Sequence, residues 1–393
     1  MRLWLVASTY PTPRQPEGGA FVRHQARALA ARGHDVVVIE LAPAARSRRA
    51  GLLGASRWSE NAPTGASTDA PTGVRVVRAQ TAGGPLPGLR WLGRRAGARI
   101  LQDVCDALGP PDLLHLHFTQ MPGLAGTAFA RRHGLPAVLT VHENEEWLRR
   151  EMGVGACRRA WRDADVVVRV SGRDAHLLRR WSPDVRVVPN GFVERPSLPS
   201  KAEARAALGL EPDAHCAVAV GAFIPRKRQD LLVEALRRVR ASGIDLRLLF
   251  VGVGPTRGHV ERLVSDSGLG DSVRFLGRVS EPDLVLAYAA ADVVCLASDA
   301  EGNPTVMFEA FGAGRPFVGT DVGGASEIVA AVGHGRVVPP GDAAALANAL
   351  QEVLARLPAE AAVRAAASPY SWDAIAGRLE GIYAGLLRGG ARR

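Results

Sequence analysis

Cysteines, aromatic residues and long apolar runs are all scarce in this chain of 393 residues. The cysteines lie far apart, with neither CxxC nor CxH spacing, so we assign them no disulfide, metal or catalytic chemistry. They are Cys105, Cys157, Cys216 and Cys295. No apolar run approaches the roughly 18 residues that a membrane-spanning helix needs. The opening MRLWLVAS is too short for a secretory signal and is typical of a buried strand, which predicts a cytoplasmic protein.

Acidic residues are outnumbered by basic ones. Lys and Arg number 49 and Asp and Glu 39, which gives a formal net charge of +10. A nucleic acid, an anionic membrane or a generally Arg-rich composition would each account for this excess. Aromatic residues make up only 5% of the chain and the Arg residues are scattered, so we expect no nucleic-acid partner.

The densest basic cluster surrounds Trp91. It combines the apolar Leu89, Trp91, Leu92 and Ile100 with Arg90, Arg94, Arg95 and Arg99. Such a segment is typical of an amphipathic helix in peripheral contact with a membrane, here at the inner face. It is equally typical of a surface helix with a solvated charged face, and the sequence leaves both interpretations open.

Short β-branched runs alternate with helical stretches along the first half of the chain. The predicted strands there are Leu3–Ala7, Val36–Glu40, Val74–Arg78, Leu113–His117, Ala137–Val141, Val166–Val170 and Val185–Val188. Helical periodicity between them, as in Phe21–Arg32 and Gly97–Leu108, favours a parallel sheet covered on both faces. Residues 43–73 are rich in Ala, Ser, Gly, Pro and Arg, break the alternation and are predicted to form a surface loop.

A second alternating block begins near Cys216. Its predicted strands lie in CAVAVGAF, LRLLFVGVG, SVRFLGRV, VVCLAS, PFVGT and HGRVVPP. We therefore expect an α/β protein made of two Rossmann-like parallel-sheet domains that face each other across a cleft. The predicted domains are residues 1–193 and residues 194–368. The helix in residues 369–393 is predicted to cross back to the first domain.

The segment LASDAEGNPTVMFEAFGAG carries the strongest local signal. An apolar strand ends, a polar turn follows, and Pro304 is predicted to take the first helical position. Glu301 then lies in the loop, whereas Thr305 and Glu309 share one face at the start of the helix. Free backbone N–H groups and the helix dipole make such a terminus a binding site for an anion such as a diphosphate. Glu309 is then placed to accept hydrogen bonds from ribose hydroxyls, and Glu301 from those of a sugar.

The two glutamates of EGNPTVMFE, with seven residues between them, resemble the EX7E signature of retaining family-4 glycosyltransferases with the GT-B fold. The segments VGVGP, VRFLGRV and LAYAAADVVCLAS upstream and GAGRPFVGTDVGGASEIV downstream are similar to that family in the same order. The resemblance covers nearly the whole chain and implies a nucleotide-sugar donor, with no metal and no other cofactor. It also implies that residues 1–193 form the acceptor-side domain and residues 194–368 the donor domain. The donor-binding residues that it implies here are Glu301, Gly302, Asn303, Pro304, Thr305 and Glu309.

The segment VGAFIPRKRQD resembles the phosphate loop of the family's second domain. Lys227 matches a lysine that faces the donor diphosphate, but Ala222 stands where an arginine is usual. Arg226 or Arg228 would restore that charge. We expect Arg226 and Lys227 to bind the donor.

Three further segments are similar to parts of the same family. Gly18 and Gly19 lack side chains, so backbone can approach a donor phosphate at the start of the next helix. Arg278, in GRV, matches the stretch that surrounds the nucleobase. Gly323, in GGASE, is expected to serve backbone geometry, and Asn190, in VVPNGFV, matches the interdomain turn.

Histidines close two of the predicted strands. His117 ends LLHLHFTQ and His142 ends VLTVHENEEW, and residues at the carboxyl ends of parallel strands face the cleft. A histidine there hydrogen-bonds a sugar hydroxyl or transfers a proton near pH 7. By resemblance, His142 is the active-site histidine and His117 and Glu143 lie on the acceptor side, whereas His115 is interpreted as structural. Their spacing is not that of a zinc site, and we expect no metal.

These features predict a glycosyltransferase that moves a sugar from a nucleotide-diphosphate donor to an unidentified acceptor with retention of anomeric configuration. A glycan, a lipid-linked acceptor and a small metabolite stay open. His142, Glu301 and Lys227 are the predicted catalytic residues, because stabilising the leaving diphosphate is the main catalytic task. The alternatives are a nucleotide-sugar epimerase of the same fold, an inactive sugar-nucleotide-binding protein, suggested by Ala222, and a nucleic-acid binder, suggested by charge alone.

Overall fold

The computed structural model describes residues 1–12, 15, 17–43, 57–61, 73–81, 90–195 and 197–390. They form two compact units, one made of Met1–Pro189 with Trp372–Arg393 and the other of Asn190–Ser371. This division falls after residues 189 and 371, whereas the sequence analysis placed its boundaries after residues 193 and 368.

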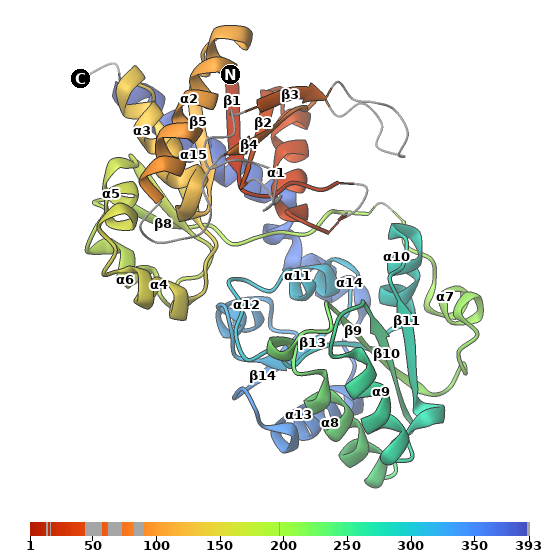
Figure 1. The fold of residues 1–393 in the computed structure, drawn as a ribbon. Helices are drawn as coiled ribbons and strands as arrows, with labels where there is room; N and C mark the ends of the chain where they lie inside the picture. Colours follow the sequence, from red (N-terminus) through yellow and green to blue (C-terminus); the bar gives the residue numbers. More distant parts are fainter. Residues whose placement is uncertain are drawn as a thin grey trace. The chain divides into compact units, whose positions relative to one another are not determined.

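The first unit is built on an eight-stranded sheet with the strand order β3-β4-β2-β1-β5-β6-β7-β8 (Figure 1). Its strands are β1 (Arg2–Ala7), β2 (Asp35–Pro43), β3 (Arg57–Asn61), β4 (Arg75–Thr81), β5 (Leu113–His117), β6 (Ala137–Val141), β7 (Val166–Arg169) and β8 (Val185–Val187). All are parallel except β3, which pairs antiparallel with β4 at the edge. The predicted parallel sheet is therefore confirmed.

Helices cover both faces of this sheet. They are α1 (Ala20–Ala31), α2 (Arg90–Leu108), α3 (Leu124–His133), α4 (Glu145–Glu151), α5 (Gly155–Asp163), α6 (Ala175–Arg179) and α15 (Trp372–Gly390), with an irregular turn η2 (Thr119–Gly123). Alternate residues of β1 point to opposite faces, so Trp4 and Val6 pack with α2, α3 and α5 while Leu3 and Leu5 pack with α1 and α15. Burial on both faces explains why these strands have unbroken apolar sequences.

The predicted surface loop at residues 43–73 contains a strand that sequence reasoning missed. Residues 57–61, RWSEN, form β3, and the other residues of the stretch, apart from 43 and 73, lie outside the described part of the chain. The expectation of a loop was wrong at this strand. The reason is that an edge strand pairs on one side only, so RWSEN needs neither the apolar run nor the β-branched residues by which the other strands were found.

The last helix, α15, belongs to the first unit. Ile375, Leu379 and Tyr383 are buried in the core that α1 shares with the sheet, and Figure 1 shows this helix in blue among the red and orange elements of that unit. Arg32, at the end of α1, forms ion pairs with Asp373 and Glu380, both at 2.8 Å. Residues from the two ends of the chain therefore stabilise one core.

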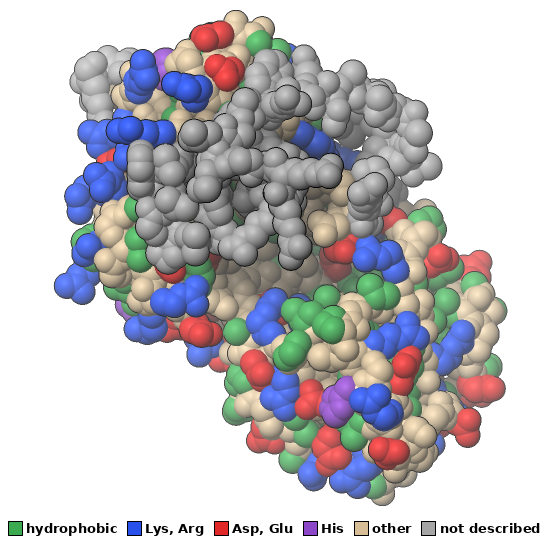
Figure 2. Space-filling model, in the orientation of Figure 1, with side chains coloured by type: hydrophobic (Ala, Val, Ile, Leu, Met, Phe, Trp, Pro, Cys, Tyr) green, Lys and Arg blue, Asp and Glu red, His purple; other side chains and the backbone are tan. Residues whose placement is uncertain are grey.

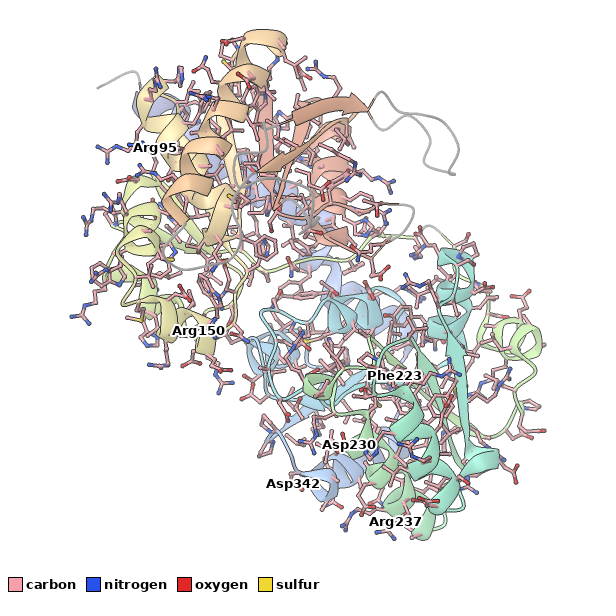
Figure 3. The ribbon with its side chains drawn as sticks, in the orientation of Figure 1. Arg95, Arg150, Phe223, Asp230, Arg237 and Asp342 are labelled. Atoms are coloured by element: carbon pink, nitrogen blue, oxygen red, sulfur yellow. The ribbon has the colours of Figure 1, made fainter. Side chains whose placement is uncertain are left out.

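The basic segment near Trp91 forms α2, which packs on α3 and β4. Ile100 is fully buried in the core, so this part of the apolar face is covered by protein, while Arg95 and Arg99 are exposed. Figure 3 shows Arg95 pointing away from the unit. Leu89 and the side chains of Arg90, Trp91 and Leu92 lie outside the described residues, and contact with a membrane stays a prediction. Among the described helices, none has the length and apolar character to cross a membrane.

The second unit contains a six-stranded, fully parallel sheet with the order β11-β10-β9-β12-β13-β14. Its strands are β9 (His215–Val220), β10 (Leu246–Val251), β11 (Val273–Gly277), β12 (Val293–Leu296), β13 (Phe317–Thr320) and β14 (Gly335–Val338). The helices are α7 (Lys201–Leu208), α8 (Gln229–Ala241), α9 (Arg257–Asp266), α10 (Glu281–Ala290), α11 (Thr305–Gly312), α12 (Ala325–Val332), α13 (Ala343–Ala355) and α14 (Glu360–Ala367), with short turns η3 (Pro225–Lys227), η4 (Gly270–Ser272) and η5 (Ser368–Tyr370). Figure 2 shows Lys and Arg side chains intermixed with Asp and Glu on the face of this unit that it draws.

Candidate active site

The loops at the carboxyl edge of the second sheet carry most of the residues singled out from sequence. Lys227 follows β9, Arg278 follows β11, and Glu301 follows β12. Because the strands are parallel, these loops emerge at one edge of the sheet, where α/β proteins bind ligands. Arg278 is exposed there.

Helix α11 begins beside this edge, one residue later than predicted. Pro304 is the N-cap, with φ −69° and ψ 105°, and Thr305 is the first helical residue, so the prediction that Pro304 takes the first helical position was wrong. Its extended ψ angle ends the polar turn before the helix starts. Proline has no side-chain oxygen to cap the first turn. The N–H of Met307 donates to the carbonyl of Pro304 at 3.2 Å, whereas the N–H groups of Thr305 and Val306 have no acceptor within the helix and remain for another acceptor. This is the chemistry of an anion site.

Glu301 joins both cations that were predicted to bind the donor. Lys227 donates to Oε1 at 2.7 Å, and Nη1 of Arg226 lies 2.9 Å from Oε2. The Glu301 side chain is only 10% exposed. Burial raises the pKa of Glu301, but the charges of Lys227 and Arg226 outweigh it and hold the pKa below its usual value.

Arg226 and Arg228 have different partners, which separates two residues that the sequence left equivalent. Arg228 pairs with Asp230 at 3.0 Å and with Asp299 at 3.2 Å, so two carboxylates compensate its charge; Asp230 is labelled in Figure 3. Arg226 instead shares Glu301 with Lys227. Arg226 is therefore the better placed of the two to supply the charge absent at Ala222.

Close backbone packing fixes the loop that carries Lys227. Gly252 has φ +139°, and a Cβ atom there would lie 2.0 Å from the carbonyl oxygen of Gly221. The Lys227 side chain runs past Gly221, with Cε 3.7 Å from where a Cβ on that glycine would be. Glycine is needed at position 252 so that the loops after β9 and β10 can touch.

Glu309 is held by a residue that sequence reasoning did not single out. Tyr288, on α10, donates to Oε2 of Glu309 at 2.5 Å, which leaves Oε1 for a further partner. Burial raises the pKa of Glu309, and donation from Tyr288 opposes that rise. The tyrosine lies in LAYAAADVV, but no spacing in the sequence connects it to a glutamate 21 residues later.

The side chain of Asn303 makes contacts within the protein. Its Oδ1 accepts from the backbone N–H of Asn190 at 2.9 Å, and its Nδ2 donates to the carbonyl of Gly323 at 3.1 Å. Gly323 has φ +57°, and a Cβ there would lie 2.9 Å from the carbonyl oxygen of Glu301 and 3.0 Å from that of Gly302. Asn303 and Gly323 therefore set the shape of the turn that presents Glu301.

In the first unit, Gly18 and Gly19 connect β1 to α1. Gly19 is the N-cap of α1 with φ +67°, and a Cβ on it would lie 2.4 Å from the carbonyl oxygen of Thr9. Gly18 is less confined, since its Cβ would lie 3.3 Å from Oγ1 of Thr9. The backbone conformation requires glycine at position 19, and the helix that it starts has no side-chain cap.

Three histidines of the first unit, His115 and His117 of β5 and His142 just after β6, form one stacked group. The ring centroids of His115 and His117 are 4.6 Å apart, and those of His117 and His142 are 5.2 Å apart. His115 and His117 are fully buried, whereas His142 is partly exposed. Burial lowers the pKa of His117 to about 3 and those of His115 and His142 well below the usual value, so all three are neutral at pH 7. His117 thus lies beneath His142 rather than at the surface.

Glu143 follows His142 in the chain and is partly buried. Its Oε1 accepts from the backbone N–H of Thr119 at 2.7 Å. Its Oε2 has no hydrogen-bond partner in the described part of the chain. Burial raises the pKa of Glu143. A hydroxyl group is a suitable partner for this oxygen, since it donates to a carboxylate and accepts from a carboxylic acid.

Metal ligands do not gather in either unit as far as the structure describes it. Within residues 1–43, 57–61, 73–81 and 90–390, omitting 13, 14, 16 and 196, no three His, Cys, Asp or Glu side chains are arranged to hold an ion.

Comparison with known proteins assigns both halves of the chain to related families. The profile of glycosyltransferase family 4 matches residues 18–193, and that of glycosyl transferases group 1 matches residues 200–368. The chain is 30% identical over 296 residues to the phosphatidyl-myo-inositol mannosyltransferase of Mycobacterium leprae (strain TN), which covers 72% of this chain and 76% of the relative.

Solved structures show the same fold over nearly the full length. Sucrose-phosphate synthase of Thermosynechococcus elongatus superposes with a TM-score of 0.73 at 25% identity, covering 99% of this chain and 100% of that one. Anabaena HepE, solved in complex with UDP, gives a TM-score of 0.72 at 20% identity, covering 98% and 100%. The chain therefore belongs to the family-4 glycosyltransferases and has their GT-B fold.

Proposed function

We propose that this glycosyltransferase takes its sugar from a nucleoside diphosphate sugar and transfers it with retention of configuration, without a metal or other cofactor. The second unit binds the donor. The observation that carries the proposal is the convergence of Lys227 and Arg226 on Glu301, at the edge of the sheet where α11 begins. Two cations and free helix N–H groups suit a diphosphate, and Glu301 suits the hydroxyls of a sugar attached to it.

Glu309 is proposed to bind the ribose. With Oε2 held by Tyr288, its Oε1 is the atom left to accept from a ribose hydroxyl. Arg278 is proposed to lie at the nucleobase. A nucleotide is also what Anabaena HepE holds, as UDP, in its solved structure. The identity of the base is left to experiment.

The acceptor is proposed to be a polyhydroxylated molecule bound by the first unit, where Glu143 and His142 offer partners to hydroxyl groups. A glycan or a lipid-linked acceptor fits this chemistry, and the related mycobacterial protein is named for a phosphatidyl-myo-inositol acceptor. An acceptor on a lipid would also give a role to the basic helix α2, through a contact at the inner face of a membrane.

In the proposed reaction the bond between the anomeric carbon and the β-phosphate oxygen breaks. The acceptor oxygen forms its new bond on the same face of the sugar, and its proton passes to the leaving diphosphate. Negative charge grows on that diphosphate, so Lys227 and Arg226 stabilise the transition state more than the ground state. Water is excluded as a competing acceptor when the donor is enclosed.

Donor turnover with product analysis tests this proposal. The protein is incubated with UDP-, GDP- and ADP-sugars, with phosphatidylinositol, myo-inositol or water as acceptor, and the products are followed by proton NMR. Release of nucleoside diphosphate together with a product of the donor's anomeric configuration supports the proposal. Inverted product contradicts retention, a changed donor sugar without release identifies an epimerase, and donor that stays bound but intact identifies an inactive binding protein.

A further inference from the structure

A chain of side-chain contacts runs through the first unit from the C-terminal helix to His142. It starts at Tyr383 on α15, passes through His115, Gln25 of α1 and His117, and ends at His142. The distances along it are 2.5 Å, 3.1 Å, 3.5 Å and 2.9 Å. Each imidazole is neutral and carries one hydrogen, so the direction of one hydrogen bond sets the next.

Tyr383 is the hydrogen-bond donor at the start of this chain of contacts. Its side chain is fully buried, and in the described part of the chain its hydroxyl meets one polar atom, Nδ1 of His115. A buried hydroxyl hydrogen without an acceptor is costly, so Tyr383 donates and Nδ1 of His115 carries no hydrogen. His115 then has its hydrogen on Nε2, 2.6 Å from Oγ1 of Thr140, which accepts it.

Gln25 is the hydrogen-bond donor that faces His117. Nδ1 of His115 carries no hydrogen and has a single lone pair, so the amide nitrogen of Gln25, 3.1 Å away, shares this acceptor with Tyr383 as the weaker donor. The same nitrogen lies 3.5 Å from Nε2 of His117, a longer and weaker contact. An amide nitrogen offers two hydrogens and accepts none, so Nε2 of His117 also faces a donor and carries no hydrogen.

His117 in turn is the hydrogen-bond donor to His142. Its hydrogen is on Nδ1, which lies 2.9 Å from Nε2 of His142 and donates to it. His142 therefore has its own hydrogen on Nδ1. His142 is the partly exposed member of the group, and no hydrogen bond of its Nδ1 atom is recorded with the described residues.

We propose that His117 is a positioning residue that holds His142 as the Nδ1–H tautomer, so that His142 donates a hydrogen bond to a substrate oxygen and does not act as a base. The tautomer follows from contacts within the first unit. That the oxygen belongs to the transferred sugar or to the acceptor rests on the proposed function. Tyr383, on the C-terminal helix, thus determines the tautomer of His142 through this chain of hydrogen bonds.

Nuclear magnetic resonance of the full chain with ¹⁵N-labelled histidine tests the tautomers directly. The ten histidines are distinguished by single substitutions at His115, His117 and His142. We expect the hydrogen on Nδ1 in His117 and His142 and on Nε2 in His115 at pH 7. A hydrogen on Nε2 of His142, or a mixture of both forms, overturns the proposal.

Removing the first donor provides a second test. Tyr383→Phe is expected to convert His142 from a single tautomer to a mixture, whereas Tyr370→Phe, the same change in the other unit, leaves it unchanged. An unaltered His142 signal in Tyr383→Phe shows that Tyr383 does not set the direction. If Tyr383→Phe fails to fold, the spectrum of the unsubstituted protein still shows which tautomer His142 adopts.

Substitution of His142 itself links the tautomer to activity. Asparagine places an amide nitrogen near the position of Nδ1, and glutamine places one near Nε2. We expect His142→Asn to keep about tenfold more kcat/KM than His142→Gln, the equivalent of one hydrogen bond. The opposite order contradicts a donor role at Nδ1. If no sugar donor is turned over by the unsubstituted protein, the proposed function fails while the tautomer result stands.

Discussion

Nζ of Lys227 lies 2.7 Å from Oε1 of Glu301, although 74 residues separate them in sequence. The pair joins the loop after β9 to the loop after β12, and Arg226 adds a second cation to the same carboxylate. In the proposed donor complex, a diphosphate would share these cations with Glu301. A change at Lys227, the proposed catalytic cation, is therefore expected to affect Glu301, the proposed sugar-binding carboxylate, as well.

Loss of Lys227 should lower stability in a pH-dependent way. Lys227 helps to hold the pKa of Glu301 down, and a lowered carboxyl pKa contributes stability above the unfolded pKa that is lost as pH falls through the folded one. We expect Lys227→Gln to cost about 1–2 kcal/mol at pH 7 and progressively less as pH falls below about 4.3, the usual pKa of a glutamate carboxyl. The free energy of unfolding in urea, measured at pH 7 and at one acidic pH value, tests this expectation. Arg237→Gln, an exposed cation labelled in Figure 3, should show no comparable change, and an equal loss at both pH values would argue against the pairing.

Arg226 and Arg228 should differ in donor affinity. Arg226→Ala removes a cation from the proposed diphosphate site, so nucleotide affinity should fall about tenfold, while Arg228→Ala should change it less than threefold because Asp230 and Asp299 compensate that charge. Isothermal titration with UDP, GDP and ADP makes the comparison. Adding Ala222→Arg to Arg226→Ala should recover affinity. Equal losses in the two single variants would mean that Arg226 has no special role.

Tyr288 should govern recognition of the ribose. Tyr288→Phe frees Oε2 of Glu309 and lets the carboxylate turn, so preference for a ribonucleotide over the matching 2′- or 3′-deoxynucleotide should fall about three- to tenfold. The ratio of the two dissociation constants is the measurement. Tyr370→Phe is the control. An unchanged ratio in Tyr288→Phe would show that Tyr288 does not affect recognition of the ribose.

Glycine at position 252 should be required for both stability and binding. Gly252→Ala places a Cβ against the carbonyl of Gly221 at a φ angle that alanine avoids, so we expect a loss of about 3 kcal/mol and weaker nucleotide binding. Gly270→Ala, whose Cβ would meet nothing within 4 Å, should change stability by no more than about 0.5 kcal/mol. Thermal unfolding compares the two, and similar midpoints would contradict the packing argument.

Apolar runs were enough to predict most of the fold. Val36–Glu40 and Ala137–Val141 belong to strands of a parallel sheet that is covered on both faces, so their sequences, VVVIE and AVLTV, are mostly apolar and easy to recognise. RWSEN was missed because an edge strand has no such requirement. The start of α11 was predicted one residue too early, at Pro304 instead of Thr305, because proline is common at the first helical position.

The site was predicted less completely, because its pairings join residues that are distant in sequence. Glu301 and Lys227 were each identified by local motif, but nothing local shows that they form an ion pair. Tyr288 was overlooked because its partner lies on another helix. His117 was expected to face the acceptor side from its place at a strand end, but its side chain is fully buried, with the amide nitrogen of Gln25 on α1 3.5 Å from its Nε2.

Nucleotide binding at Lys227 is the most direct test of the central claim, and the chain offers a matched control because it has only two lysines, Lys201 and Lys227. Lys201 pairs with the buried Asp292 in the same unit. Isothermal titration of the unsubstituted protein, Lys201→Gln and Lys227→Gln with UDP, GDP and ADP compares them. We predict that one nucleotide binds, that Lys227→Gln weakens it by about tenfold or more, and that Lys201→Gln does not. Binding of no nucleotide at millimolar concentration, or equal affinity in all three proteins, would contradict the donor site proposed here.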